Sequence, residues 1–165
     1  MLELKPLHGD ALDRAMKKAE HYRLLNEPRM AESICLDLLR AQPENQHALT
    51  TLILALTDQF GDDSFCVSNT SVQDLIPRLS DPYERVYYSG LICERRGLAT
   101  LNQRVPGYVA YDWFRSALEF YEEAEVKSPE GNDDAIVRYN TCVRIIQNNP
   151  SIEPRSEDED FQHLE

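Results

Sequence analysis

The chain has little glycine and no long apolar run. Glycine occurs six times in 165 residues, runs of β-branched residues are few, and Ala, Leu, Glu and Arg are abundant. This composition favours helices over strands. The richest apolar stretch, residues 49–56, is much shorter than the roughly 20 residues that a membrane-spanning helix needs. The sequence therefore predicts a soluble, all-α protein.

Basic residues are also scarce. The chain contains 17 Lys and Arg against 29 Asp and Glu, which gives a formal net charge of −12. Because nucleic acids and anionic lipid surfaces attract basic proteins, this balance argues against both as partners. We expect a protein or peptide partner, with no nucleic acid and no membrane.

Cysteine is infrequent and lacks the spacing of a metal or redox site. The chain has no Cys-x-x-Cys pair, and Met1 is followed by polar residues rather than by an apolar signal-like segment. These features favour a reducing, cytoplasmic location. The four cysteines are best interpreted as small core residues: Cys35, Cys66, Cys93 and Cys142.

Motifs for catalysis are missing too. The four histidines are scattered, and neither a His-Glu-x-x-His sequence nor a glycine-rich phosphate loop occurs. The acidic pairs Asp62-Asp63 and Asp133-Asp134 lie beside glycines without forming a calcium loop, and helix capping explains them more simply. We therefore predict no enzyme activity, no catalytic residue, no metal and no cofactor.

Turn signals divide the chain into about seven helices. Asp10 or Asp13 can cap the first helix, Pro28 suits the first turn of the second, and Asn132 or Asp133 can cap the last. The segment 62–80 is ambiguous because Pro77 removes a helical donor from it. The expected helices cover 10–26, 28–42, 45–60, 81–101, 112–127 and 132–149, with the ambiguous short one between the third and fourth. The domain organisation expected from this is a lead-in at 1–9, a helical domain at 10–149 and an acidic, unstructured tail at 150–165.

An internal repeat relates the second helix to the fifth long one. At one constant sequence offset, Ala31 aligns with Ala117, Leu38 with Ala124 and Pro43 with Pro129. Cys35 aligns with Tyr121 at the same offset. Small apolar residues at regular places and a proline after the helix are expected where a helix packs closely between two neighbours in a stack.

This pattern resembles the tetratricopeptide repeat, a helix pair of about 34 residues with small residues at its crossing points. The resemblance covers Ala11 to Ile146. Ala19, Tyr22, Ala31 and Pro43 match a first unit; Gly90, Gly97, Ala117, Tyr121, Ala124 and Pro129 match a later one. The chain departs from the pattern at 98–112, which we interpret as an insertion, and after Pro43, where a proper second helix is missing.

The resemblance implies a right-handed α-α superhelix of antiparallel helix hairpins, in which the first helix of each pair lines a concave groove. It places the partner-binding side chains on four helices: Lys17, Glu20 and Arg23; His47, Thr50, Thr51, Leu54 and Asp58; Tyr87, Tyr88, Glu94 and Arg95; Asn140 and Arg144. Tyr and Arg are typical of binding hot spots. Since Tyr87 and Tyr88 are adjacent on a helix, about 100° apart, one of them could instead pack inside.

Three other features have two interpretations each. Arg85, Arg95, Arg96 and Arg104 could clamp an acidic peptide, or could pair with Glu84, Glu94 and nearby acids across helix turns. The aromatic segment 105–113 could anchor a partner or fold back on the domain, with Trp113 in the core. The acidic tail could keep the protein soluble, or could compete for the groove as a pseudo-ligand.

The function expected from these observations is a scaffold or adaptor that binds a peptide segment of a partner protein in a concave groove. The alternative is a dedicated chaperone for a secreted or membrane-inserting client. Co-purification would separate them, because an adaptor belongs to a multi-protein assembly and a chaperone binds one client that is insoluble without it. A homo-dimer formed through the end helices is a third alternative.

Overall fold

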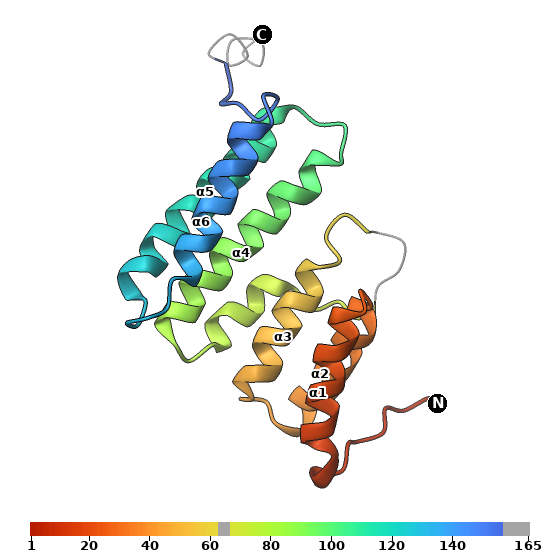
Figure 1. The fold of residues 1–165 in the computed structure, drawn as a ribbon. Helices are drawn as coiled ribbons and strands as arrows, with labels where there is room; N and C mark the ends of the chain where they lie inside the picture. Colours follow the sequence, from red (N-terminus) through yellow and green to blue (C-terminus); the bar gives the residue numbers. More distant parts are fainter. Residues whose placement is uncertain (63–66, 157–165) are drawn as a thin grey trace. The chain divides into compact units, whose positions relative to one another are not determined.

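The computed structural model describes residues 1–62 and 67–156, and its secondary structure there is helical throughout (Figure 1). Six α-helices and two 3-10 helices occur in these ranges: η1 (Gly9–Ala11), α1 (Leu12–Leu24), α2 (Pro28–Ala41), α3 (Gln46–Thr57), η2 (Val72–Arg78), α4 (Pro82–Leu101), α5 (Gly107–Lys127) and α6 (Asp134–Asn148). The all-α prediction is confirmed. Within the same ranges, none of these helices is long and apolar enough to span a bilayer.

The chain divides into two compact units, and the division falls within α4, between Tyr88 and Ser89. The sequence predicted a single helical domain over 10–149 and gave no sign of this division. The reason is that α4 is one uninterrupted helix in the sequence pattern, from the start signal Asp81-Pro82 onward. Each unit is described by itself below.

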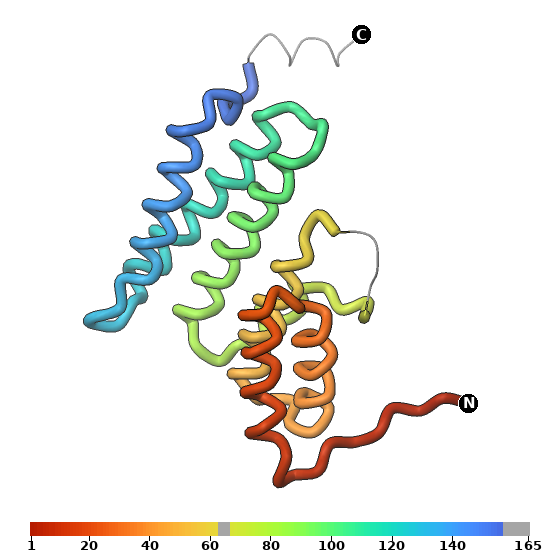
Figure 2. Tube along the Cα trace, turned by 45° about the vertical axis from the view of Figure 1, so that its right-hand side comes forward, coloured from red at the N-terminus to blue at the C-terminus, as the bar shows by residue number. Residues whose placement is uncertain are grey.

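The first unit is built around α3. Its side chains are apolar on nearly every face, and Ala48, Leu49, Leu52, Ile53 and Ala55 are fully buried. A helix of this kind must be covered on several sides. The α2 helix packs against both α1 and α3, while η2 also packs against α3 (Figure 2).

Local signals explain how these helices begin and end. Pro28 occupies the first turn of α2, as predicted, and the Asn45 side chain accepts a hydrogen bond from the Ala48 amide at 3.0 Å at the start of α3. Asn26, with a φ of 58°, reverses the chain between α1 and α2 in the left-handed region that asparagine tolerates. The prediction that Asp10 or Asp13 caps α1 is wrong, because the 3-10 turn η1 leads directly into that helix and Ala11 is its N-cap.

A buried carboxylate connects α2 to the segment that follows α3. Glu32 is only 2% exposed, and its two oxygens accept hydrogen bonds from Gln59 (2.9 Å) and from the Ser68 hydroxyl. Both donors are neutral, so they satisfy the carboxylate without an ion pair. The ambiguous segment 62–80 therefore has a specific anchor, and its helix is the 3-10 helix η2, in which Pro77 needs no α-helical donor. Residues 63–66 of that segment lie outside the described ranges.

The second unit depends on close approach between α4 and α5. A side-chain carbon added at Gly90 would lie 2.8 Å from the Tyr121 ring, and one at Gly97 would lie 3.0 Å from the Phe114 ring. Both rings are fully buried. The two glycines that carried the repeat pattern are therefore the places where α4 lacks a side chain so that an aromatic ring of α5 can pack against its backbone.

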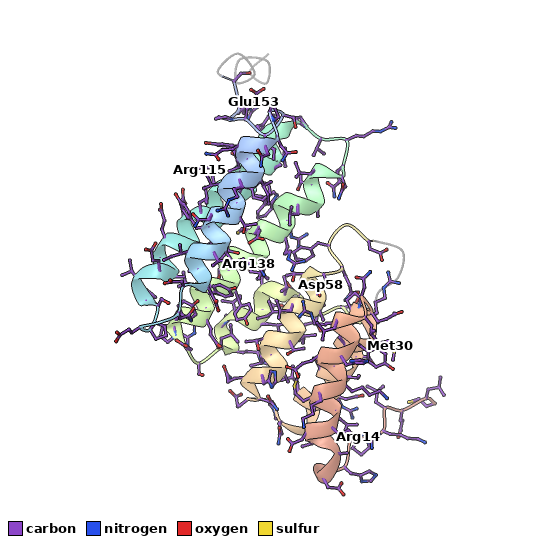
Figure 3. The ribbon with its side chains drawn as sticks, viewed as in Figure 1. Arg14, Met30, Asp58, Arg115, Arg138 and Glu153 are labelled. Atoms are coloured by element: carbon purple, nitrogen blue, oxygen red, sulfur yellow. The ribbon has the colours of Figure 1, made fainter. Side chains whose placement is uncertain are left out.

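Glu94 is a buried carboxylate of the second unit. The prediction that it lines an open groove is therefore wrong. It is 2% exposed, accepts a hydrogen bond from the Tyr121 hydroxyl at 2.6 Å and forms an ion pair with Arg138 of α6 at 3.1 Å (Figure 3 labels Arg138). Burial, followed by the charge of Glu94, raises the pKa of Tyr121, so the phenol stays protonated as a donor. Glu94 therefore joins three helices and is not available to a ligand.

Two boundaries in the second unit differ from the sequence prediction. The α4 helix reaches Leu101 and α5 begins at Gly107, so the expected insertion at 98–112 is reduced to residues 102–106. Trp113 is half-buried, and Tyr108 lies under the Arg155 guanidinium, 5.2 Å from its ring centroid. The beginning of the tail is also structured, because Ile152 is 4% exposed and the Ser151 carbonyl contacts Gly107. Residues 157–165 of the tail lie outside the described ranges.

We predict that Gly90→Ala destabilises the protein by about 1 to 3 kcal/mol, since the new methyl group overpacks the Tyr121 ring. Alanine is the better helix former, so a purely local effect would have the opposite sign. Urea unfolding measures the difference. Gly9→Ala is the control, because open space surrounds Gly9; an equal midpoint for Gly90→Ala and the wild type would contradict the packing described above.

We predict that Arg138→Ala lowers the free energy of unfolding by about 2 to 3 kcal/mol, because it leaves the buried Glu94 carboxylate without its cation. This expected loss of stability is at the low end for a buried ion pair because the Arg138 side chain is 32% exposed. Arg144→Ala on the exposed side of α6 is the matched control and should change stability little. Similar denaturant midpoints for the two variants would disprove a structural role for the pair.

Candidate functional site

A hollow of about 580 Å³ lies on the first unit, beside α3. The α1 helix forms one wall and the beginning of α4 supplies Tyr88. Eight residues line it: Glu20, Arg23 and Leu24 of α1; His47, Thr50, Thr51 and Leu54 of α3; and Tyr88 of α4. We call this set the α3 hollow. The α3 hollow brings together side chains from α1, α3 and α4, which are not adjacent in the sequence.

An ion pair fixes one end of the α3 hollow. The Arg23 guanidinium of α1 contacts the Asp58 carboxylate, which directly follows α3, at 2.8 Å through two of its nitrogens (Figure 3 labels Asp58). Both side chains are largely buried, at 24% and 17% exposure. The charge of Arg23 is therefore balanced within the unit, and its role in the hollow is to hold the two helices at a set distance.

A second polar pair bridges the same two helices nearer the other end. His47 Nε2 lies 2.7 Å from a Glu20 carboxylate oxygen, and both side chains are about half exposed. Pairs as exposed as this one contribute little to stability. Glu20 and His47 are therefore placed on the rim, where a ligand could exchange this contact for its own at small cost.

Tyr88 closes the third side of the α3 hollow. Its side chain is half-buried, and burial, followed by the Glu84 charge one turn earlier on α4, raises its pKa to about 12. The phenol is therefore protonated at neutral pH and can donate a hydrogen bond. Leu54 and the 85%-exposed Leu24 add apolar surface beside this donor.

The α3 hollow contains seven of the residues that the resemblance assigned to the groove: Glu20, Arg23, His47, Thr50, Thr51, Leu54 and Tyr88. Asp58, also assigned to the groove, pairs with Arg23. Lys17 is exposed and lies outside the lining. Tyr87 does not line it either, because its ring packs between Tyr83, with 5.6 Å between ring centroids, and Tyr88 at 5.2 Å. The two adjacent tyrosines thus have different environments.

The remaining predicted residues belong to the second unit. Arg95 is half-buried on α4, while Asn140 and Arg144 are exposed on α6. Leu24 was missed by the sequence prediction. The sequence signal that could have identified Leu24 is its place in the last turn of α1, next to Arg23 and outside the apolar stripe that packs on α2.

Of the four arginines for which the sequence left two interpretations open, Arg85 lies in the first unit and the other three in the second. Arg85 directs its Nε to the Leu79 carbonyl at 2.6 Å, which ties the start of α4 to the end of η2. The pairing of Glu94 with its sequence neighbours is wrong, because that carboxylate bonds to Arg138 and Tyr121. Among residues 1–62 and 67–156, no group of three His, Cys, Asp or Glu side chains is arranged to hold a metal ion.

The cysteines of the described ranges are core residues, as predicted, and Cys66 lies outside those ranges. Cys35, Cys93 and Cys142 are free thiols and buried. Burial raises their pKa values to about 12, 11 and 12 respectively. A raised pKa keeps a thiol protonated and therefore unreactive.

We predict that a Cys66→Ser variant resists thiol reagents while folded. At about pH 8 an ordinary exposed cysteine is partly thiolate, whereas the three buried thiols stay protonated until the pH approaches their raised pKa values. Absorbance assays with a disulfide reagent should detect reaction only after urea is added. Rapid labelling of the native variant at this pH would show that one of these side chains is accessible.

Comparison with family models, with curated proteins and with solved structures gave no match to this chain.

Proposed function

We propose that this protein is a non-catalytic binding module that holds a peptide segment of a partner protein in the α3 hollow. The observation that carries the proposal is the hollow itself: about 580 Å³ of space, lined by one side of α1 and α3, which is the side that the resemblance to tetratricopeptide repeats assigns to ligand binding. A volume in the range of 300 to 1,000 Å³ suits a few side chains of a ligand.

The lining of the α3 hollow has the mixture that recognition of a peptide requires. Leu24 and Leu54 offer apolar contact, the Tyr88 hydroxyl and the Thr50 side chain offer hydrogen bonds, and both Glu20 and His47 lie on the rim. Aromatic anchors inside a polar rim are typical of protein interfaces. The exposure of Leu24 supports the same conclusion, because a leucine left 85% exposed gains by being covered.

Site-specific photo-crosslinking in cells tests where a partner binds. A photoreactive phenylalanine derivative replaces Leu24 at the rim in one variant and Lys17, also exposed on α1 but outside the lining, in a second. We expect a discrete crosslinked protein from position 24 and none from position 17. The same products from both positions, or none from position 24, would exclude the α3 hollow as the binding site.

A second test blocks the hollow without touching the core. In the double variant Leu24→Ser/Thr50→Trp, one change removes an exposed apolar contact and the other fills part of the space with an indole ring. We predict at least about 10-fold weaker binding of the crosslinked partner, the equivalent of one or two lost hot-spot contacts, measured by titration calorimetry. Lys17→Ala should bind as the wild type does, and circular dichroism confirms that the double variant is folded.

A further inference from the structure

The charges around the α3 hollow do not cancel. Arg23 is the one arginine or lysine in its lining, and the Asp58 carboxylate at 2.8 Å already balances it. Glu20 shares the rim with His47, which compensates it only when the imidazole is protonated. The lining and its direct partners therefore have no surplus positive charge, and Glu20 adds negative charge at neutral pH.

Glu84 adds a second negative charge beside the hollow. It lies one helical turn before Tyr88 on α4, so both residues share a face, and its charge acts on the Tyr88 phenol. Its side chain is half-buried, and no ion pair or hydrogen bond of the Glu84 carboxylate is present among the described residues. Burial, followed by the Asp81 charge, raises the pKa of Glu84.

The net charge of the whole first unit is also negative. Residues 1–88 contain nine Lys and Arg against fourteen Asp and Glu. At physiological ionic strength exposed charges are screened beyond about 8 Å, so Glu20 in the lining and Glu84, one turn before Tyr88, are acids that can act on a ligand there. Complementary charge governs which partners associate quickly and in which register.

We infer that the α3 hollow takes a basic peptide segment, with a Lys or Arg that pairs with Glu84 or Glu20 and an apolar side chain seated on Leu24 and Leu54. The inference rests on the proposed function and specifies its ligand class. It differs from the acidic ligand that the arginines of the sequence offered as one alternative; of those arginines, Arg85 lies in the first unit and contacts the Leu79 carbonyl.

Selection from a library of short random peptides tests the inference directly. The full-length wild type is the bait, and peptides that also bind Leu24→Ser/Thr50→Trp are removed. We expect the remaining sequences to have net positive charge and at least one aliphatic or aromatic residue. Synthetic peptides from this set, labelled with a fluorophore, are then titrated by fluorescence anisotropy at low and at high salt.

Single neutral replacements assign the charge contacts. Glu84→Gln should weaken binding of the selected peptide about 5-fold, in the range of a lost hydrogen bond to a charged group, and it should not impair folding because it removes an uncompensated charge. Glu44→Gln is the matched control: it makes the same change of net charge on an exposed acid outside the hollow lining. We expect its affinity to equal that of the wild type.

The outcomes separate the inference from the function on which it rests. If no peptide depends on the hollow, both the proposed function and the inference are overturned. If peptides depend on the hollow but are neutral or acidic, or bind Glu84→Gln and Glu44→Gln equally, the binding function stands and the basic ligand is refuted. Basic peptides that lose affinity with Glu84→Gln alone support both.

Discussion

The first unit depends on the burial of α3. This helix has so few polar side chains that α1, α2 and η2 must surround it, and Ala48, Leu49, Leu52 and Ile53 lose all contact with solvent as a result. Full burial of a leucine or isoleucine side chain contributes about 1.5 to 3 kcal/mol to the stability of the fold. Thr50, Thr51 and Leu54 of the same helix line the α3 hollow. One helix thus supplies both the core and the candidate site.

Polar contacts in the two units serve different purposes. Glu32 and Glu94 are buried carboxylates that join elements distant in sequence, one through neutral donors and the other through Tyr121 and Arg138. Such groups specify a single arrangement, because any other packing leaves a carboxylate unsatisfied. The Glu20–His47 pair on the rim of the α3 hollow is more exposed and can rearrange at lower cost, which is the property that a binding surface requires. The distribution of burial therefore separates structural charges from those available to a ligand.

The repeat pattern has a clear physical basis in each unit. Ala31, Cys35 and Leu38 of α2 are buried to the same degree as their aligned partners Ala117, Tyr121 and Ala124 of α5. The larger Tyr121 fits because Gly90 faces it, whereas Cys35 needs no such space. The α2 and α5 helices thus bury equivalent faces, although the aligned residues differ in size. This equivalence concerns the buried face of one helix in each unit.

The sequence by itself determined the all-α class, the helices with strong start signals such as Pro28 and Asp81-Pro82, and the burial of α3 and of the repeat positions. These follow from periodicity and capping, which act over a few neighbouring residues. Only the tertiary structure decided the division within α4, the burial of Glu94, the packing of Ile152 against the rest of its unit, and which groove residues meet around the α3 hollow. Each of these depends on contacts between residues far apart in the chain. Helical register assigned Lys17, Arg23, Tyr87 and Tyr88 alike to the binding face, and only the packing in the structure decided that Arg23 and Tyr88 line the hollow while Lys17 and Tyr87 do not.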